Sequence, residues 1–367
     1  MQAAHPSPLI AIISDNIDES RLMRSALSDR YHVTAFPSVI SAIYACRLTV
    51  PQVVIVDEPI VRASRGSVVK TLRGEPGMDV VPVFLAITTD GCDLSDLLRE
   101  LGAYGIVAKP IHGDTLLRQV SRALNLGIEA KWDALPEAAR TALKETSLAF
   151  GRLNAMVEEG EPVIYSDLTI AASALANVTD AENIQHLLDG VREHDDYTYV
   201  HCLKVATMLA MFGRRISMSE DQVTVLAAGG MLHDIGKIAV PLAILNKPGR
   251  LNEREWTVMK DHVPATIRYL EAFGEVPRPV VSIAAQHHEK LDGSGYPLGL
   301  AGSQLNELAR MAAIIDIFTA LTDRRVYKPG MPAEKALGLM TNQMGPHLDP
   351  RLLQVFRHIV LDEGLSF

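Results

Sequence analysis

The sequence predicts two domains: an N-terminal α/β domain with a doubly wound parallel sheet, and a C-terminal all-α domain, joined by a helical linker. The chain of 367 residues is too long for a single core. Strand-like and helix-like segments alternate in its first third, a pattern typical of parallel sheets covered by helices on both faces. Beyond Pro162 the apolar spacing is helical. We therefore place the domains at 8–127 and 162–367, with the linker at 128–161.

The N-terminal domain contains short apolar or β-branched runs that predict strands at Leu9–Ile13, Tyr31–Phe36, Val53–Asp57, Val81–Ile87 and Ile106–Ala108. Amphipathic stretches such as Glu19–Leu27 and Leu94–Leu101 lie between them. Ligands of parallel α/β folds bind at the carboxyl ends of the strands. Asp15 follows the first of these strands, Asp57 ends the third, and Lys109-Pro110 follows the last.

This order of residues, with Thr88 near the end of the fourth strand, resembles the receiver domains of response regulators. The resemblance implies that Asp57 accepts a phosphoryl group from a sensor histidine kinase, with Mg²⁺ and Lys109 holding the phosphate oxygens. Two positions depart from the family pattern: Ser14 replaces an acidic residue, and Ile106 replaces an aromatic one. The alternative interpretation is therefore a degenerate receiver that serves dimerisation.

The linker shows a helical pattern from Trp132 to Glu159, and Gly160-Glu161-Pro162 ends it. Its partial apolar stripe fits a helix that pairs with its copy in a homodimer, or a helix packed on its own domain. The C-terminal domain should then contain helices at Ala181–Glu193, Thr198–Phe212, Asp221–His233, Glu253–Phe273, Pro279–His288, Leu308–Thr322 and Ala333–Gln343.

Composition narrows the classes of function. A net charge of −9 argues against binding of DNA, although a few local cations suffice for a small anion. The three cysteines, Cys46, Cys92 and Cys202, are widely spaced, as expected of reduced thiols. No signal-peptide pattern or membrane-length apolar run is evident. We expect a cytoplasmic protein without a membrane partner.

The His233-Asp234 pair follows the apolar helical run Val223–Leu232 and is weak evidence by itself. Asp316, however, lies inside the apolar run Met311–Phe318, where a carboxylate is costly unless it is paired or bound to a metal. Further histidines occur on other predicted helices, namely His201, His262, His287 and His288. Each has a purely structural interpretation, but imidazoles and carboxylates together are typical ligands of iron, manganese, zinc or nickel. Two such metals form a common phosphoester-cleaving centre.

The segment His233–Lys237 resembles the signature of the HD superfamily of metal-dependent phosphohydrolases. The segment His287–Pro297 is similar to the second signature of its HD-GYP subfamily. Further similarities lie at Asn246–Leu251 and at Ala320–Thr322 with Arg325, Tyr327 and Lys328. The resemblance implies hydrolysis of cyclic di-GMP to linear pGpG, and in some members on to GMP. Some members prefer mixed cyclic dinucleotides.

The resemblance also implies roles for individual residues. Asp234 should bridge two divalent metals, iron or manganese first and nickel or zinc as alternatives, and Lys237 should stabilise the charge that develops on the phosphate. Arg325, Lys328 and Tyr296 should contact the substrate. The full implied set of metal ligands is His201, His233, Asp234, His262, His287, His288 and Asp316. Diguanylate cyclase domains are implied as partners of the loop around Gly295.

One departure bears on the number of metals. Tyr197 stands where some members have a glutamate that helps to bind a third metal, so we predict two metals. Two other functions are weighed against the phosphodiesterase: a low-turnover cyclic dinucleotide sensor that acts through protein partners, and a general nucleotide phosphohydrolase. The second signature argues against the latter.

Overall fold

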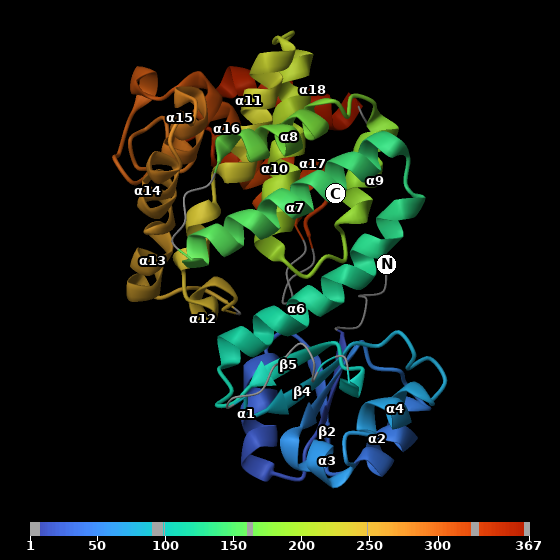
Figure 1. Ribbon diagram of the computed structural model, residues 1–367. Coiled ribbons are helices and arrows are strands. Elements are labelled where there is room, and N and C mark those ends of the chain that lie inside the picture. Colours follow the sequence, from blue (N-terminus) through green and yellow to red (C-terminus); the bar gives the residue numbers. More distant parts are fainter. Residues whose placement is uncertain are drawn as a thin grey trace. The chain divides into compact units, whose positions relative to one another are not determined.

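The computed structural model describes residues 8–89, 98, 100–159, 164–247, 249–323 and 330–362 (Figure 1). The chain divides into two compact units, Met1–Gly127 and Ile128–Phe367. Among the described residues, no helix is long and apolar enough to cross a membrane.

The first unit contains a five-stranded sheet in the order β2-β1-β3-β4-β5, and all its neighbouring strands are parallel. The doubly wound parallel sheet is thus confirmed. Two strands begin later than predicted, at His32 and at Val83; the latter start directly follows Pro82, which has no N–H to donate. The strands are β1 (Leu9–Ile13), β2 (His32–Phe36), β3 (Val53–Asp57), β4 (Val83–Ile87) and β5 (Gly105–Ala108).

Helices cover this sheet. Helix α1 begins two residues before the predicted start because the side chain of Asn16 accepts hydrogen bonds from the backbone N–H groups of Asp18 and Glu19. Three short helices, α2, α3 and α4, were not predicted, and most of the predicted helix Leu94–Leu101 lies outside the described residues. The helices of this unit are α1 (Ile17–Leu27), α2 (Val39–Cys46), α3 (Glu58–Ala63), α4 (Val68–Arg73) and α6 (Gly113–Glu129).

The second unit is helical, apart from an isolated bridge between Asp292 and Ala301, which confirms the predicted all-α domain. Its α-helices are α7 (Glu137–Glu159), α8 (Tyr165–Ala176), α9 (Ala181–Gly190), α10 (Tyr197–Arg215), α11 (Glu220–Leu232), α12 (Leu242–Leu245), α13 (Glu253–Lys260), α14 (His262–Phe273), α15 (Arg278–Gln286), α16 (Glu307–Thr322), α17 (Ala333–Gln343) and α18 (Pro350–Asp362). Short 3₁₀ turns are η1 (Ala130–Ala134), η2 (Ile235–Ala239) and η3 (Gly302–Gln304).

Helix α7, which corresponds to the linker segment, packs against α8 and α9 in the second unit. Its apolar stripe, including Leu143 and Phe150, is buried in the core of that unit. The hydroxyl groups of Thr146 and Tyr199 are 3.0 Å apart, which ties α7 to α10. Leu143 and Phe150 of the stripe are therefore covered within their own domain.

Three differences concern the C-terminal helices. The predicted helix Glu253–Phe273 is two helices that meet at Asp261, because Pro264 fits only in the first turn of a new helix. Helix α8 was not predicted because its apolar residues do not form a clear stripe along one face of the helix. Helix α18 was missed although Asp349 caps it, accepting hydrogen bonds from the backbone N–H groups of Arg351 and Leu352 at 3.0 and 3.1 Å.

Candidate metal centre

The residues implied as metal ligands come from neighbouring helices of the second unit. Helix α11 packs against α10 and α15, while α16 packs against the same two helices. His201 lies within α10 and Asp316 within α16, whereas His233 and His287 are the residues that end α11 and α15. His262 opens α14. Helix packing thus brings residues that are far apart in the sequence into one buried cluster.

A close backbone contact places His262 beside Asp234. The N–H of Gly236 donates to Oγ1 of Thr266 at 2.9 Å, and that hydroxyl in turn donates to the carbonyl of His262 at 2.9 Å. A Cβ atom on Gly236 would lie 2.0 Å from the same carbonyl oxygen. Only glycine allows turn η2, which follows Asp234, to approach the start of α14 this closely.

Three of the histidines are oriented in the same way. The Nδ1 atoms of His233, His262 and His287 lie 2.7, 2.6 and 2.9 Å from the backbone carbonyl oxygens three residues earlier in the chain. Their Nε2 atoms are buried and have no hydrogen-bond partner among the described residues, and the same holds for Oδ1 of Asp234. Buried polar atoms rarely lack partners, so these convergent atoms fit a bound metal cation.

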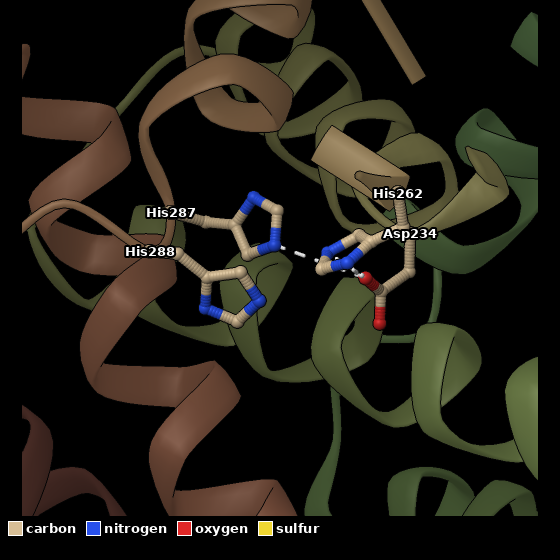
Figure 2. A group of neighbouring side chains, drawn as sticks. All are labelled: Asp234, His262, His287 and His288. Carbon is tan, nitrogen blue, oxygen red and sulfur yellow. Dashed lines mark ion pairs between the residues drawn. The ribbon is translucent and has the colours of Figure 1, made fainter. Parts of the chain in front are cut away.

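The donor atoms form two groups that share Asp234. One group contains His262, His287 and His288; Nε2 of His262 lies 3.1 Å and Nε2 of His287 3.8 Å from Oδ1 of Asp234 (Figure 2). The other contains His201 and His233, whose Nε2 atoms lie 3.7 and 3.3 Å from Oδ2 of Asp234. A carboxylate with one oxygen toward each group has the geometry of a bridge.

Asp316 lies next to both groups. Its Oδ1 is 2.9 Å from Nε2 of His201 and 4.0 Å from Nε2 of His233, while its Oδ2 is 3.6 Å from Nδ1 of His288. The side chain is largely buried, as expected of a carboxylate in an apolar run that must be paired or bound. The structure therefore brings together all seven residues implied as ligands.

The protonation of the cluster suits metal binding. Burial and the neighbouring His288 and His233 hold the pKa of His287 well below its usual value, and burial lowers the pKa of His288 to about 3. Both imidazoles are thus neutral near pH 7, the form that binds metals. Burial alone would raise the pKa of Asp234, but Lys237 and His233 outweigh it and hold that pKa well below its usual value.

His201 differs from the other histidines. Burial alone would lower its pKa, but hydrogen bonds with Asp316 and Asp323 outweigh that effect and raise the pKa of His201 to about 9. Binding of a metal at Nε2 therefore displaces a proton. Tyr197, one turn earlier on α10, stacks on this ring with centroids 5.9 Å apart. This is the position where some family members have a glutamate.

Lys237 lies beside the shared carboxylate, and its ammonium group forms an ion pair with Oδ2 of Asp234. The ion pair and Asp316 raise the pKa of Lys237 against the opposing effect of burial, so the side chain stays charged. A fixed cation at this place stabilises negative charge near the cluster. The predicted substrate contacts Arg325 and Lys328 lie outside the described residues.

The loop after His288 is organised by Glu289, whose role the sequence did not reveal. Its buried carboxylate accepts hydrogen bonds from the backbone N–H groups of Leu298, Gly299 and Leu300 at 2.6, 3.1 and 3.0 Å. A Cβ atom on Gly295 would lie 2.4 Å from Cα of Glu289, so only glycine allows the loop to approach this closely.

This loop places Tyr296 at the edge of the cluster. The ring of Tyr296 lies 4.7 Å from that of His288, and the ring of Trp256 contacts Tyr296 edge-on at 6.1 Å between centroids. Trp256 is 45% exposed. Tyr296 and Trp256 thus form an aromatic row that leads from His288 to the protein surface.

The residues implied for the receiver-like site have different hydrogen-bond partners. Lys109 Nζ lies 2.6 Å from Oδ1 of Asp57, and the hydroxyl of Ser14 donates to Oδ2 of Asp57 at 2.6 Å. The hydroxyl of Thr88 donates instead to Glu58 Oε2 at 2.8 Å. Asp15 is exposed. The structure brings Asp57 and Lys109 together and engages Thr88 elsewhere.

Comparison with known proteins places the chain in a family. Residues 174–352 match the family model described as HD domain. The cyclic di-GMP phosphodiesterase PA4108 of Pseudomonas aeruginosa is 36% identical over 63% of this chain, which spans 58% of that protein. RpfG, a cyclic di-GMP phosphodiesterase response regulator of Xanthomonas campestris pv. campestris, is 31% identical over 71% of this chain and 70% of its own length.

A solved structure shares the fold. The HD-GYP-type protein Bd1817 of Bdellovibrio bacteriovorus superposes with a TM-score of 0.51 at 18% identity, over 66% of this chain and 80% of that one. The HD match, residues 174–352, includes all seven residues of the cluster. The chain therefore belongs to the HD-GYP family of HD-domain phosphodiesterases with a receiver-like N-terminal domain.

Proposed function

We propose that the helical unit is a metal-dependent phosphodiesterase that hydrolyses cyclic di-GMP to linear pGpG. The observation that carries this proposal is the pair of donor groups that share Asp234, with three buried Nε2 atoms left without hydrogen-bond partners among the described residues. PA4108 and RpfG are both named cyclic di-GMP phosphodiesterases, which supports cyclic di-GMP as the substrate.

We assign two divalent metals to this centre. His201, His233 and Asp316 would hold one, His262, His287 and His288 the other, and Asp234 would bridge them. Imidazole and carboxylate ligands favour iron or manganese, with nickel or zinc as alternatives. Bound metals of this kind polarise a phosphate and make a water nucleophilic near neutral pH. The phenol ring of Tyr197 offers no carboxylate for a third metal.

The protein's own residues would orient the substrate and stabilise charge. Lys237, held by Asp234, would face a non-bridging phosphate oxygen, where a fixed ammonium group stabilises the added negative charge. The cations Arg325 and Lys328 would neutralise phosphates, which is how a chain of net charge −9 binds an anionic dinucleotide. Tyr296 would pack against the sugar or base.

The decisive test is purification without oxygen, metal analysis, and identification of the products formed from cyclic di-GMP. We expect two metals per chain and release of pGpG, and the same assay measures whether pGpG is hydrolysed further to GMP. The double variant H233A/D234A should lose both metal and activity. Full activity in this variant, or a wild-type protein without metal, would overturn the proposal. Cyclic GMP-AMP in parallel assays measures the preference among cyclic dinucleotides.

We also propose a regulatory role for the receiver-like unit. A sensor histidine kinase would phosphorylate Asp57 with Mg²⁺ held by Asp57 and Asp15, and diguanylate cyclase domains would dock on the loop around Gly295. Lys109 beside Asp57 supports the first part. Pull-down with a kinase or cyclase domain tests the partners, and loss of binding in a variant of the loop would be expected for the cyclase.

A further inference from the structure

A buried ion pair lies beside the metal centre but outside its ligand set. Lys204 on α10 and Asp323 at the end of α16 have exposed fractions of 8% and 5%, and Lys204 Nζ lies 2.6 Å from Oδ1 of Asp323. Removing two charges from water is unfavourable unless further interactions compensate. We therefore expect this buried pair to make a further interaction that compensates for its burial.

The second oxygen of Asp323 supplies that explanation. Oδ2 of Asp323 lies 3.3 Å from Nδ1 of His201, while Nε2 of the same ring faces the metal centre, 2.9 Å from Oδ1 of Asp316. His201 and Lys204 are three residues apart on α10, so both reach Asp323 from one helix face. Lys204 thus holds Oδ1 of Asp323 in place, and Oδ2 is left to face Nδ1 of His201.

His201 needs this carboxylate because of its place in its helix. The carbonyl partners of His233, His262 and His287 are Gly230, Met259 and Ala284, all in the last turns of helices, where carbonyl oxygens lack intrahelical partners. His201 lies inside α10, where the preceding carbonyls are already used by the helix. Its Nδ1 therefore requires a side-chain acceptor.

We propose that Asp323, anchored by Lys204, is a positioning residue that holds His201 with Nδ1 protonated and Nε2 directed at the metal. The proposal rests on the assignment of His201 as a metal ligand. Carboxylates that accept a hydrogen bond from a ligating histidine fix its tautomer and raise its basicity, and their loss weakens metal binding by about 10–100-fold.

A purely structural role for Asp323, tying α16 to α10, predicts a different outcome. It would lower the melting temperature without changing metal affinity. The matched control is Asp349, which is also buried and ion-paired, to Arg310 at 2.7 Å. Among the described residues, no contact joins Asp349 to a residue assigned as a ligand.

The experiment compares full-length D323N and D349N with the wild type, measuring Mn²⁺ affinity by chelator competition together with the melting temperature. We expect D323N to lose about 10–100-fold in affinity for one of its two metals. D349N should bind both metals as the wild type does, even where its melting temperature falls. Unchanged affinity in D323N would overturn the inference.

Lys204→Met provides a second test that keeps the carboxylate. It should weaken metal binding less than D323N, and the double variant should be no weaker than D323N alone, because Lys204 acts through Asp323. Additive losses would contradict this order of action. A wild-type protein that binds no metal would instead refute the proposed function itself, which separates the two failures.

Discussion

Nε2 of His262 lies 3.1 Å from Oδ1 of Asp234, although neither atom forms a hydrogen bond in the part of the chain that the structure describes. Asp234 directly precedes turn η2 and His262 opens helix α14, and Gly236 allows these two elements to approach. Two acceptor-capable atoms at this distance in a buried site gain most from a shared cation. The relationship makes Asp234 the residue on which both donor groups depend.

Replacing the shared carboxylate should therefore remove more metal than replacing one histidine. We expect D234N to lose both metals and turnover to fall by at least about 100-fold, whereas H262A should keep one metal. Metal content per chain, measured after anaerobic purification, distinguishes the two. D292N, which changes an exposed carboxylate, is the control and should keep both. Equal metal loss in D234N and H262A would argue against a bridge.

Glu289 should contribute mainly to stability. In E289A, three backbone N–H groups of the loop lose their acceptor, and an unsatisfied buried donor costs about 1–3 kcal/mol. We expect the free energy of unfolding to fall by about 2–4 kcal/mol in chemical denaturation, since part of the loop can reach water. The control E307A removes an exposed ion pair with Arg351 and should change it by less than about 1 kcal/mol. If E289A also changed the free energy of unfolding by less than about 1 kcal/mol, Glu289 would not stabilise the loop as proposed.

Binding of the dinucleotide should alter the fluorescence of Trp256. The chain has two tryptophans, and Trp132 is buried with its indole N–H donating to the carbonyl of Gly190. A purine near Tyr296 would approach only the exposed ring of Trp256. We expect saturable quenching by pGpG in the wild type and none in W256F. Quenching that persists in W256F would place the ligand elsewhere.

Tyr296 itself should affect substrate binding more than metal binding. Stacking of a base on an aromatic ring contributes about 1–3 kcal/mol, so Y296L should raise KM by roughly tenfold or more. Metal content should remain that of the wild type, because no ligand atom is removed. A Y296L variant with wild-type KM and a reduced kcat would argue for a role in the chemistry instead.

The sequence predicted the two folds and the metal cluster for different reasons. The strands could be located because short apolar runs in a parallel sheet are bounded by turns. The cluster could be located because four of its residues lie in two signatures and because Asp316 is a carboxylate within an apolar run. Periodicity could not show that α10, α11 and α15 converge. Lys204 and Asp323 were missed, although Lys204 lies in an apolar helix and the reasoning applied to Asp316 would have found it. Glu289 gave no local signal because its partners are backbone groups nine to eleven residues later.

The receiver-like site provides the last prediction. Ser14 stands where receivers have a second acidic residue, and its hydroxyl donates to Asp57 at 2.6 Å, on the oxygen opposite the one that Lys109 contacts. Mg²⁺ would have to replace this hydrogen bond with only Asp15 to add a second carboxylate. We expect slow phosphorylation of Asp57 by acetyl phosphate in the wild type, measured by mass spectrometry.

Replacing Ser14 by an acidic residue should make phosphorylation of Asp57 faster. S14D removes the hydroxyl donor and adds a negative charge next to the cation, which should raise Mg²⁺ affinity by about tenfold and speed phosphorylation. D57N in both backgrounds is the control and should show no modified residue. If the wild type is phosphorylated as fast as S14D, then Ser14 does not limit the site. Faster phosphorylation of S14D with unchanged hydrolysis of cyclic di-GMP would instead separate the receiver-like unit from control of the metal centre.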